Sequence, residues 1–178
     1  MLLNLTDGVS LGDNAPQEIN VIIEIPKGSH NKYEINKENG LLELDRANYS
    51  DAAYPVEYGF APQTLWEDGD PLDVLVLATY PIPPLTLVKV RPVAVMEMTD
   101  EGESDYKILA VPVKDKRWED VNDLEDLNKH TLKEIQHFFE TYKQLKGTAE
   151  VVISGFKGKD AAYEAVKKSI ELYKNKNK

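Results

Sequence analysis

The order in which strand and helix patterns follow one another most constrains the fold of this chain. Short segments that are apolar and β-branched, or that alternate polar and apolar residues, predict strands, and most of them precede residue 115. The predicted strands span residues 21–25, 32–35, 41–45, 73–78, 87–98, 107–113 and 149–154. The sequence has no strand–helix–strand alternation and no glycine-rich phosphate loop after a strand, which excludes P-loop and Rossmann folds.

Helical periodicity is confined to the C-terminal part of the chain. From Leu132 onward apolar residues recur at helical spacing and Gly147 supplies a stop, whereas Asp160 is predicted to cap a second helix. The apolar positions are Ile135, Phe138, Phe139, Tyr142 and Leu145 in the first helix, and Tyr163, Val166, Ile170 and Tyr173 in the second. Strands first and helices late predict an α+β fold, in which a curled antiparallel sheet or small barrel is flanked by helices.

Two local signals refine the predicted sheet. Asn39-Gly40 is a strong turn signal and predicts a hairpin between the strands at 32–35 and 41–45. Pro92 interrupts the longest predicted strand, and because proline cannot donate a ladder hydrogen bond it predicts an edge position or a bulge. With 178 residues and no linker-like stretch, the chain is expected to form a single domain, 1–178.

Charge and cysteine content exclude several classes of protein. The chain has 31 acidic residues against 21 lysines and arginines, a formal net charge of −10. General nucleic-acid binders and binders of anionic membranes carry the opposite sign, so neither partner is expected. The absence of cysteine excludes a disulfide framework, a thiolate metal site and a cysteine nucleophile. No apolar run approaches the roughly 18 residues of a membrane span and no signal peptide is recognisable, so a cytoplasmic location is expected.

An acidic turn that leads into an apolar strand is the most informative segment. Asp68, Asp70 and Asp73 stand at positions i, i+2 and i+5. Clustered carboxylates repel one another and cost stability unless a cation or protons neutralise them. A solvated surface turn is the alternative, but Asp73 opens a buried-looking strand, where an unpaired carboxylate is costly. An EF-hand calcium loop is excluded, because its fifth and sixth positions hold leucine and aspartate instead of an oxygen ligand and glycine.

A second acidic cluster occupies a predicted hairpin tip, where Asp100 and Asp105 precede Lys107. Residues two apart on an extended segment point the same way, so the Asp105 carboxylate and the Lys107 ammonium are expected to face one site. Glu24 interrupts an otherwise apolar strand. There is an alternative to a functional role in each case. The hairpin tip could simply be solvated, and Glu24 could face water from an edge position. With no cysteine and only three histidines, oxygen-only ligation of Mg²⁺ or Mn²⁺ is favoured over zinc.

Basic and phenolic side chains recur in the predicted strands and in the first helix. They are Lys32, Arg46, Tyr54, Tyr58, Tyr142 and Lys143, and Glu34 shares a strand face with Lys32. Each alone has a structural explanation, since lysine and arginine are usually surface charges and Tyr142 lies on an apolar helix face. Beside carboxylates that hold divalent metals, these donors together predict a site for a strongly anionic phosphate compound.

With these residues in place, the chain resembles the soluble family I inorganic pyrophosphatases of the compact bacterial and archaeal type. The segment from Asp68 to Val74 matches the family signature D-x-D-P-x-D followed by an apolar residue. Further matching motifs lie at residues 23–26, 32–34, 44–46, 54–59, 91–93, 98–100 and 137–143. The resemblance implies a five-stranded antiparallel OB-like β-barrel with extra strands and two main flanking C-terminal helices. It also implies Mg²⁺ dependence and assembly into homohexamers.

The resemblance further implies roles for the residues of the acidic turn. Asp68, Asp73 and Asp105 would hold the tightest Mg²⁺ ion, and Asp73 would also contact a second one. Asp70 would be the catalytic residue, acting on the water that bridges these two ions. In this reading the turn supplies both the metal site and the proton acceptor of the reaction.

Other residues are assigned through the same resemblance. Asp100 together with Asp105 would serve an Mg²⁺ ion carried by the substrate, and Glu24 would reach a further ion. Mn²⁺ or Zn²⁺ are conceivable substitutes for Mg²⁺. The implied ligands of the phosphate oxygens are Lys32, Arg46, Tyr58, Lys107, Tyr142 and Lys143, with Glu34 and Tyr54 in supporting positions.

The function implied is Mg²⁺-dependent hydrolysis of inorganic pyrophosphate to two orthophosphates, which drives pyrophosphate-releasing biosynthesis. A metal-activated water would attack in line, without a covalent intermediate. A haloacid-dehalogenase-like phosphatase, whose first aspartate is the nucleophile, is one alternative, but it expects a Rossmann-like sheet and Thr or Val where Leu72 stands. An OB-like module that binds divalent ions or oligonucleotides without catalysis is another. A basic groove with stacking aromatics is expected of such a module, whereas this chain is acidic with 8% aromatic residues.

Overall fold

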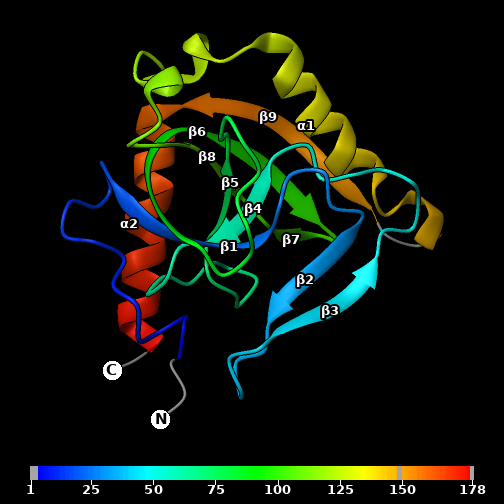
Figure 1. Cartoon of the computed structure of the whole chain (residues 1–178), viewed down its shortest axis with the longest axis horizontal. Coiled ribbons are helices and arrows are strands. Elements are labelled where there is room, and N and C mark those ends of the chain that lie inside the picture. The colour runs from blue at the N-terminus through cyan, green and yellow to red at the C-terminus, as the bar shows by residue number, and fades with distance from the viewer. Residues whose placement is uncertain (1–3, 148–149, 177–178) are drawn as a thin grey trace.

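The computed structural model describes residues 4–147 and 150–176 (Figure 1). These residues form a seven-stranded sheet and a separate two-stranded sheet. The strands of the larger sheet are β1 (Ile19–Ile25), β4 (Glu57–Phe60), β5 (Asp73–Val76), β6 (Leu87–Asp100), β7 (Glu103–Ser104), β8 (Lys107–Pro112) and β9 (Val151–Gly158). The smaller sheet consists of β2 (Asn31–Ile35) and β3 (Leu42–Ala47). Ala149, the first residue of the last predicted strand, lies outside the described residues.

Five of the strands close into a barrel. The ring runs β1–β4–β5–β8–β6, and β6 pairs back onto β1, while β7 and β9 also pair with β6. The predicted barrel with extra strands and two C-terminal helices is therefore confirmed. The prediction that all its strands are antiparallel is wrong at one place, because β5 and β8 run parallel. The chain travels from β5 to β8 through β6 and β7, and such a long connection permits a parallel pair that a hairpin would not.

The sheets show the outcome of the two local signals, the Asn39-Gly40 turn and the interruption at Pro92. β2 and β3 pair antiparallel, as the Asn39-Gly40 signal predicts, and Gly40 has a φ of 72°. Pro92 lies in the interior of β6, so an edge position is wrong. The register between β6 and β8 shifts between Pro92 and Ala94, so the bulge is the correct alternative. The bulge accommodates a residue that has no N–H to give to the ladder.

Strand β4 was not predicted from the sequence, because four residues that include a glycine give a weak strand signal. Gly59 is nevertheless required there. A Cβ at this position would lie 2.1 Å from the carbonyl oxygen of Ile22 on β1, so only glycine lets the two strands pair. The close approach of β4 to β1 carries Tyr58 into the ring beside the acidic segments.

Two helices follow the strands, α1 (Lys129–Thr141) and α2 (Lys159–Lys176). The first begins three residues before Leu132, the predicted start, because the Asn128 side chain accepts hydrogen bonds from the backbone N–H groups of residues 130 and 131. After α1 a short 3₁₀ turn, η3 (Gln144–Lys146), ends at Gly147, whose φ is 90°. Within the described residues no helix is long and apolar enough to cross a bilayer.

The start of α2 differs from the prediction. Asp160 lies inside the helix rather than capping it. Instead, the backbone N–H of Lys159 donates to the Asp123 carboxylate at 2.8 Å, so the cap comes from a residue 36 positions away. The Asp123 carboxylate sits so close to the chain that a Cβ at Gly158 would meet it at 2.5 Å. A cap supplied through tertiary contact leaves no local sequence signal.

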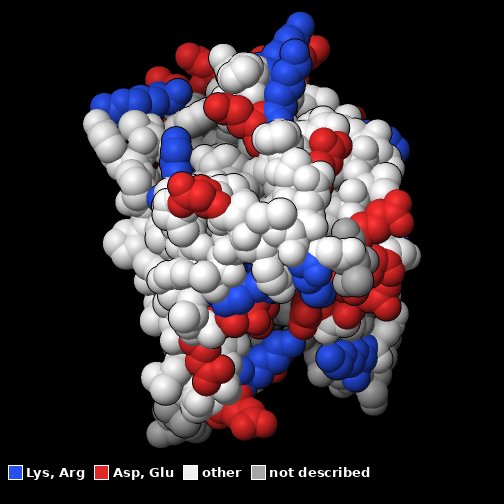
Figure 2. Space-filling model, turned by 90° about the vertical axis from the view of Figure 1, so that its right-hand side faces the viewer, with Lys and Arg blue, Asp and Glu red and all other residues white. Residues whose placement is uncertain are grey.

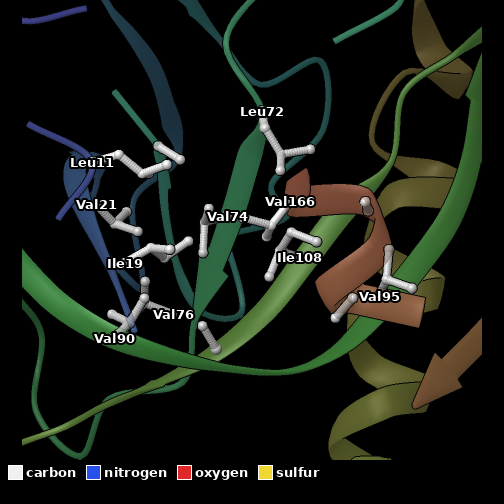
Figure 3. Close-up of a cluster of buried hydrophobic side chains, with 14 of the residues drawn as sticks. Leu11, Ile19, Val21, Leu72, Val74, Val76, Val90, Val95, Ile108 and Val166 are labelled. Carbon is white, nitrogen blue, oxygen red and sulfur yellow. The ribbon is translucent and has the colours of Figure 1, made fainter. Parts of the chain in front are cut away.

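Apolar clusters pack on both faces of the central strands. Along β5, Val74 and Val76 belong to a cluster under α2, whereas Leu75 belongs to a second cluster that includes the buried face of α1. Figure 3 shows Val74 among other aliphatic side chains of the first cluster, including Val166 of α2. Because side chains alternate along a strand, Asp73 shares the face of Leu75. The polar residue that opens β5 therefore points to the side of the sheet that α1 covers.

Candidate active site

A cavity of about 290 Å³ collects residues from nearly every part of the fold. Its wall contains the carboxylates Glu24, Glu34, Asp68, Asp70, Asp73, Asp100 and Asp105, the cations Lys32, Lys37, Arg46, Lys107 and Lys143, and the phenols Tyr54, Tyr58 and Tyr142. Every residue that the sequence analysis assigned to the site is in this set. Figure 2 shows red carboxylates and blue cationic groups interleaved around a hollow in the lower half of one face of the molecule.

The parallel pair of strands explains why the two acidic segments meet. In the register of β5 and β8, Asp73 stands opposite Lys107. Because the strands run in the same direction, the turn that enters β5 and the hairpin tip that enters β8 lie at the same end of the barrel. Asp68 and Asp70 precede β5 there, and Asp105 precedes β8. Segments more than 30 residues apart in the sequence thus share one wall of the cavity.

The ammonium group of Lys107 joins these segments. It donates to Asp73 Oδ2 and to Asp105 Oδ1, both at 2.6 Å, and to the Tyr58 hydroxyl at 3.2 Å. The lysine is 2% exposed. Burial alone would lower the pKa of Lys107, but the facing carboxylates raise it above the usual lysine range, so the ammonium is retained. The predicted convergence of Asp105 and Lys107 on one site is confirmed by this contact.

Two carboxylates share this one ammonium, so the pocket keeps an excess of negative charge. Burial raises the pKa of Asp73 to about 6, Lys107 lowers it, and the Asp105 charge adds to the increase. Burial also raises the pKa of Tyr58 well above that of an exposed phenol. The same cause raises the pKa of Tyr54 and of Tyr142. All three phenols therefore remain protonated and able to donate hydrogen bonds at neutral pH.

The second acidic segment forms another ion pair at the cavity wall. Lys143, which follows α1, donates to Asp100 Oδ2. The other carboxylate oxygen, Asp100 Oδ1, is buried and has no hydrogen-bond partner. A buried carboxylate oxygen without a donor is costly, so this oxygen would gain from contact with a further positive group.

The donor chemistry fits a hard divalent cation. Within residues 4–147 and 150–176, no three carboxylate or histidine side chains stand close enough together to hold a metal ion as they are. Lysine ammonium groups instead neutralise the carboxylates. Lys107 pairs with Asp73 and Asp105, and Lys143 pairs with Asp100. The ligand atoms are all oxygens, and Asp100 Oδ1 has a free coordination capacity. Such a set suits Mg²⁺ or Mn²⁺, whose entry would require ammonium groups to withdraw.

Glu24 does not face open water, so that alternative is wrong. It projects from β1 into the cavity wall, and its Oε1 accepts a hydrogen bond of 2.9 Å from the backbone N–H of Ile35 on β2. Burial raises the pKa of Glu24 to about 8, although the Ile35 hydrogen bond opposes the shift. The charge of Lys32 also opposes the shift, yet at a pKa of about 8 this carboxyl group is largely protonated at neutral pH.

The two-stranded sheet contributes cations to the cavity wall. Lys32 and Arg46 both contact the Asp45 carboxylate, at 3.3 Å and 2.6 Å, and Lys32 also pairs with Glu34 as strand alternation predicts. Lys32 and Arg46 are neighbours across the β2–β3 ladder. Their side chains are only partly exposed, and the adjacent positive groups can engage two oxygens of one anion.

Lys37 is a cavity residue that the sequence analysis missed. It lies in the turn between β2 and β3, and its ammonium contacts Asp70 Oδ1 at 2.7 Å across 33 residues of sequence. Asp70, through this hydrogen bond, raises the pKa of Lys37. A lysine in a polar hairpin turn gives no sequence signal beyond that of a solvated loop. Only the folding of the hairpin over the barrel brings it to the acidic turn.

The sequence and the fold are both similar to those of known proteins. The model of the Pyrophosphatase family, described as inorganic pyrophosphatase, matches residues 21–174. The chain belongs to the inorganic pyrophosphatase family. An inorganic pyrophosphatase from Haloferax volcanii is 44% identical over 172 residues, 97% of each chain. One from Methanosarcina acetivorans is 48% identical over 158 residues, which cover 89% of this chain and 94% of that protein.

Solved structures agree with the family assignment. The crystal structure of inorganic pyrophosphatase from Thermus thermophilus superposes with a TM-score of 0.93 at 44% identity, over 96% of this chain and 99% of that one. The resemblance stated from the sequence motifs is thus confirmed. The chain covers between 94% and 99% of the length of these three relatives and shares the fold of the Thermus thermophilus enzyme.

Proposed function

We propose that this pyrophosphatase-family chain hydrolyses inorganic pyrophosphate to two orthophosphates in the cavity described above. The observation that carries the proposal is the meeting of the acidic turn and the hairpin tip at Lys107, which bonds to Asp73 and Asp105 at 2.6 Å. Around it, cations and protonated phenols surround a volume of about 290 Å³, suited to a small polyanion.

The cavity is proposed to take Mg²⁺, with Mn²⁺ or Zn²⁺ as substitutes. Bound Mg²⁺ would supply Lewis-acid polarisation of the phosphate oxygens and lower the pKa of water. The proposed metal ligands are Asp68, Asp73, Asp105, Asp100 and Glu24, all carboxylates of the cavity wall. The unpartnered oxygen of Asp100 supports this assignment, because a cation would complete its interactions.

The proposed chemistry is a single in-line displacement. The oxygen of a water forms a bond to one phosphorus while the bridging P–O bond breaks, and the water's proton passes to Asp70. Asp70 suits the role because its side chain lines the cavity, is 67% exposed and, among the described residues, forms an ion pair only with Lys37, which is itself exposed. Lys32, Arg46 and Lys143 are proposed to neutralise the departing phosphate, and Tyr58 and Tyr142 to donate hydrogen bonds to it.

The competing phosphatase mechanism lacks its fold. A haloacid-dehalogenase-like enzyme places its nucleophilic aspartate on a Rossmann-like sheet, whereas the described residues form a barrel with one parallel pair. Phosphate release from pyrophosphate, ATP and a phosphomonoester, each titrated with Mg²⁺, tests the proposal. We expect release from pyrophosphate to dominate, with no aspartyl-phosphate trapped by borohydride. A preference for the phosphomonoester would overturn the proposal, and no hydrolysis of any substrate would favour an ion-binding module.

Two further properties belong to the same proposal. The family resemblance supports assembly into homohexamers and action in the cytoplasm on pyrophosphate released by biosynthetic reactions. Light scattering of the purified protein measures the first property directly, and a mass six times the 20.1 kDa of one chain is expected. A monomeric mass would contradict it.

Removal of the Lys37 side chain should weaken substrate binding. Lys37→Met is expected to raise the KM for pyrophosphate by roughly 10–100-fold, because a charge-assisted hydrogen bond from this lysine to a phosphate oxygen would contribute about 1.5–3 kcal/mol. The stability of the protein should change little, since the Lys37–Asp70 pair is exposed. Steady-state kinetics test this, with Lys116→Met as a control at an exposed ion pair outside the cavity. An unchanged KM would show that Lys37 plays no part in binding.

A further inference from the structure

Behind the acidic turn, on the side away from the cavity, Trp66 is buried at 4% exposure. Its backbone N–H donates to the carbonyl oxygen of Asp70 at 2.7 Å, and its carbonyl oxygen accepts from Gly69 N–H at 3.1 Å. These two bonds close the turn that contains Asp68, whose Oδ1 accepts from the Asp70 N–H at 3.0 Å. The position of Trp66 thus determines where the turn lies.

The Trp66 side chain reaches the other acidic segment. Its indole N–H donates to Ser104 Oγ at 3.2 Å, and its ring stacks on Tyr106 with centroids 5.2 Å apart. Tyr106 lies between Asp105 and Lys107 in sequence but packs against the α2-side apolar cluster, whereas its two neighbours line the cavity. One pair of rings therefore ties together, from behind, the two segments whose carboxylates face the site.

Both rings are themselves held by charged groups. Lys168 of α2 lies over the Trp66 ring at 5.0 Å and pairs with Glu67. The Tyr106 hydroxyl donates to Glu97 Oε1 at 3.1 Å, and Glu97 in turn pairs with Lys157 of β9 at 2.9 Å. Ring stacking contributes about 0.5–1.5 kcal/mol beyond burial, so loss of one ring would loosen the connection without removing a cavity residue.

We propose that Trp66 and Tyr106 are positioning residues that fix the separation of the Asp68 and Asp105 carboxylates and so set the affinity of the site for divalent cations. The inference deepens the proposed function and rests on it. Neither ring lines the cavity, so both act through the carboxylates beside them. Outer contacts that orient metal ligands typically change metal affinity by about 10–100-fold when removed.

The test measures binding of Mg²⁺ alone, in the absence of substrate, by titration calorimetry of the full chain. Tyr106→Leu should raise the Kd for Mg²⁺ by about tenfold, whereas Tyr106→Phe, which keeps the ring and loses only the contact with Glu97, should bind like the wild type. Trp66→Phe should raise the Kd several-fold. Its matched control is Trp118→Phe. This variant loses an equivalent hydrogen bond of 3.2 Å, from the indole N–H to Thr79 Oγ1, at a place outside the cavity.

A purely structural role predicts a different pattern. It would lower the unfolding temperature of Tyr106→Leu and leave the Kd of the folded protein unchanged, and that result would overturn the inference. If Tyr106→Leu does not fold, Trp66→Phe against Trp118→Phe decides in the same way. Failure of the wild type to release phosphate from pyrophosphate would overturn the proposed function, but the inference is judged on the Mg²⁺ Kd, so the two failures are distinguishable.

Discussion

Asp70→Asn should lower kcat for pyrophosphate hydrolysis by about 10²–10⁴-fold, the range by which a positioned general base accelerates a reaction. The amide keeps the shape of the side chain, and the backbone N–H of residue 70 can still donate to Asp68 Oδ1, but the amide cannot accept a proton. Because Asp70 is exposed and its ion pair with Lys37 contributes little to folding, the unfolding temperature should remain close to that of the wild type.

The measurement is steady-state phosphate release at saturating Mg²⁺ and pyrophosphate. Asp51→Asn is the control, since Asp51 is fully exposed and lies outside the cavity, and it should retain wild-type kcat. Near wild-type turnover in Asp70→Asn would remove Asp70 from the role of base. An equal loss in both variants would indicate a general effect of charge and not a specific proton transfer.

Lys107→Met should destabilise the metal-free protein by about 3–5 kcal/mol, the usual cost of leaving a buried ion pair half broken. Methionine replaces the volume of the side chain but leaves Asp73 and Asp105 facing each other without a counter-charge. Divalent cations can neutralise the same carboxylates, so added Mg²⁺ should restore part of the lost stability. A ligand that binds only the native state raises the free energy of unfolding by RT ln(1 + [L]/Kd), where [L] is the free ligand concentration.

Urea unfolding in EDTA and in excess Mg²⁺ measures both effects. Lys116→Met is the control, because Lys116 pairs with Glu119 on the surface outside the cavity and its loss should change the stability little in either buffer. A similarly small effect for Lys107→Met would contradict the view that its ammonium compensates the two carboxylates. If Mg²⁺ stabilised the wild type but left Lys107→Met unchanged, the cation would not be acting at Asp73 and Asp105.

Sequence patterns predicted the parts of this fold that depend on local chemistry. The Asn39-Gly40 hairpin, the bulge at Pro92 and the amphipathic α1 follow from turn preferences, the missing proline N–H and helical spacing. Strand β4 and the cap of α2 could not be predicted in this way. Gly59 and Asp123 are needed only because of contacts with residues far away in the sequence. The parallel pairing of β5 with β8 likewise depends on how the chain closes into a ring.

The same distinction between local and distant effects separates the site residues that the sequence revealed from those that it did not. Residues in dense or unusual local patterns, such as Asp68, Asp70 and Asp105, were identified, and the family motifs added the scattered ones. Lys37 was missed because it sits in an ordinary polar turn and reaches Asp70 only in the folded chain. The Trp66–Tyr106 stack was missed because apolar aromatics beside a strand indicate core packing and nothing more.

The central claim is that carboxylates from separate segments combine to bind divalent cations, and that these cations are required to cleave a phosphoanhydride. Phosphate release from pyrophosphate by one enzyme sample, before EDTA, after EDTA, and after Mg²⁺ is restored in excess, tests it most directly. We expect rapid release, then its loss to the uncatalysed rate, then full recovery. Undiminished release in excess EDTA, or no release from pyrophosphate even with Mg²⁺, would contradict the account.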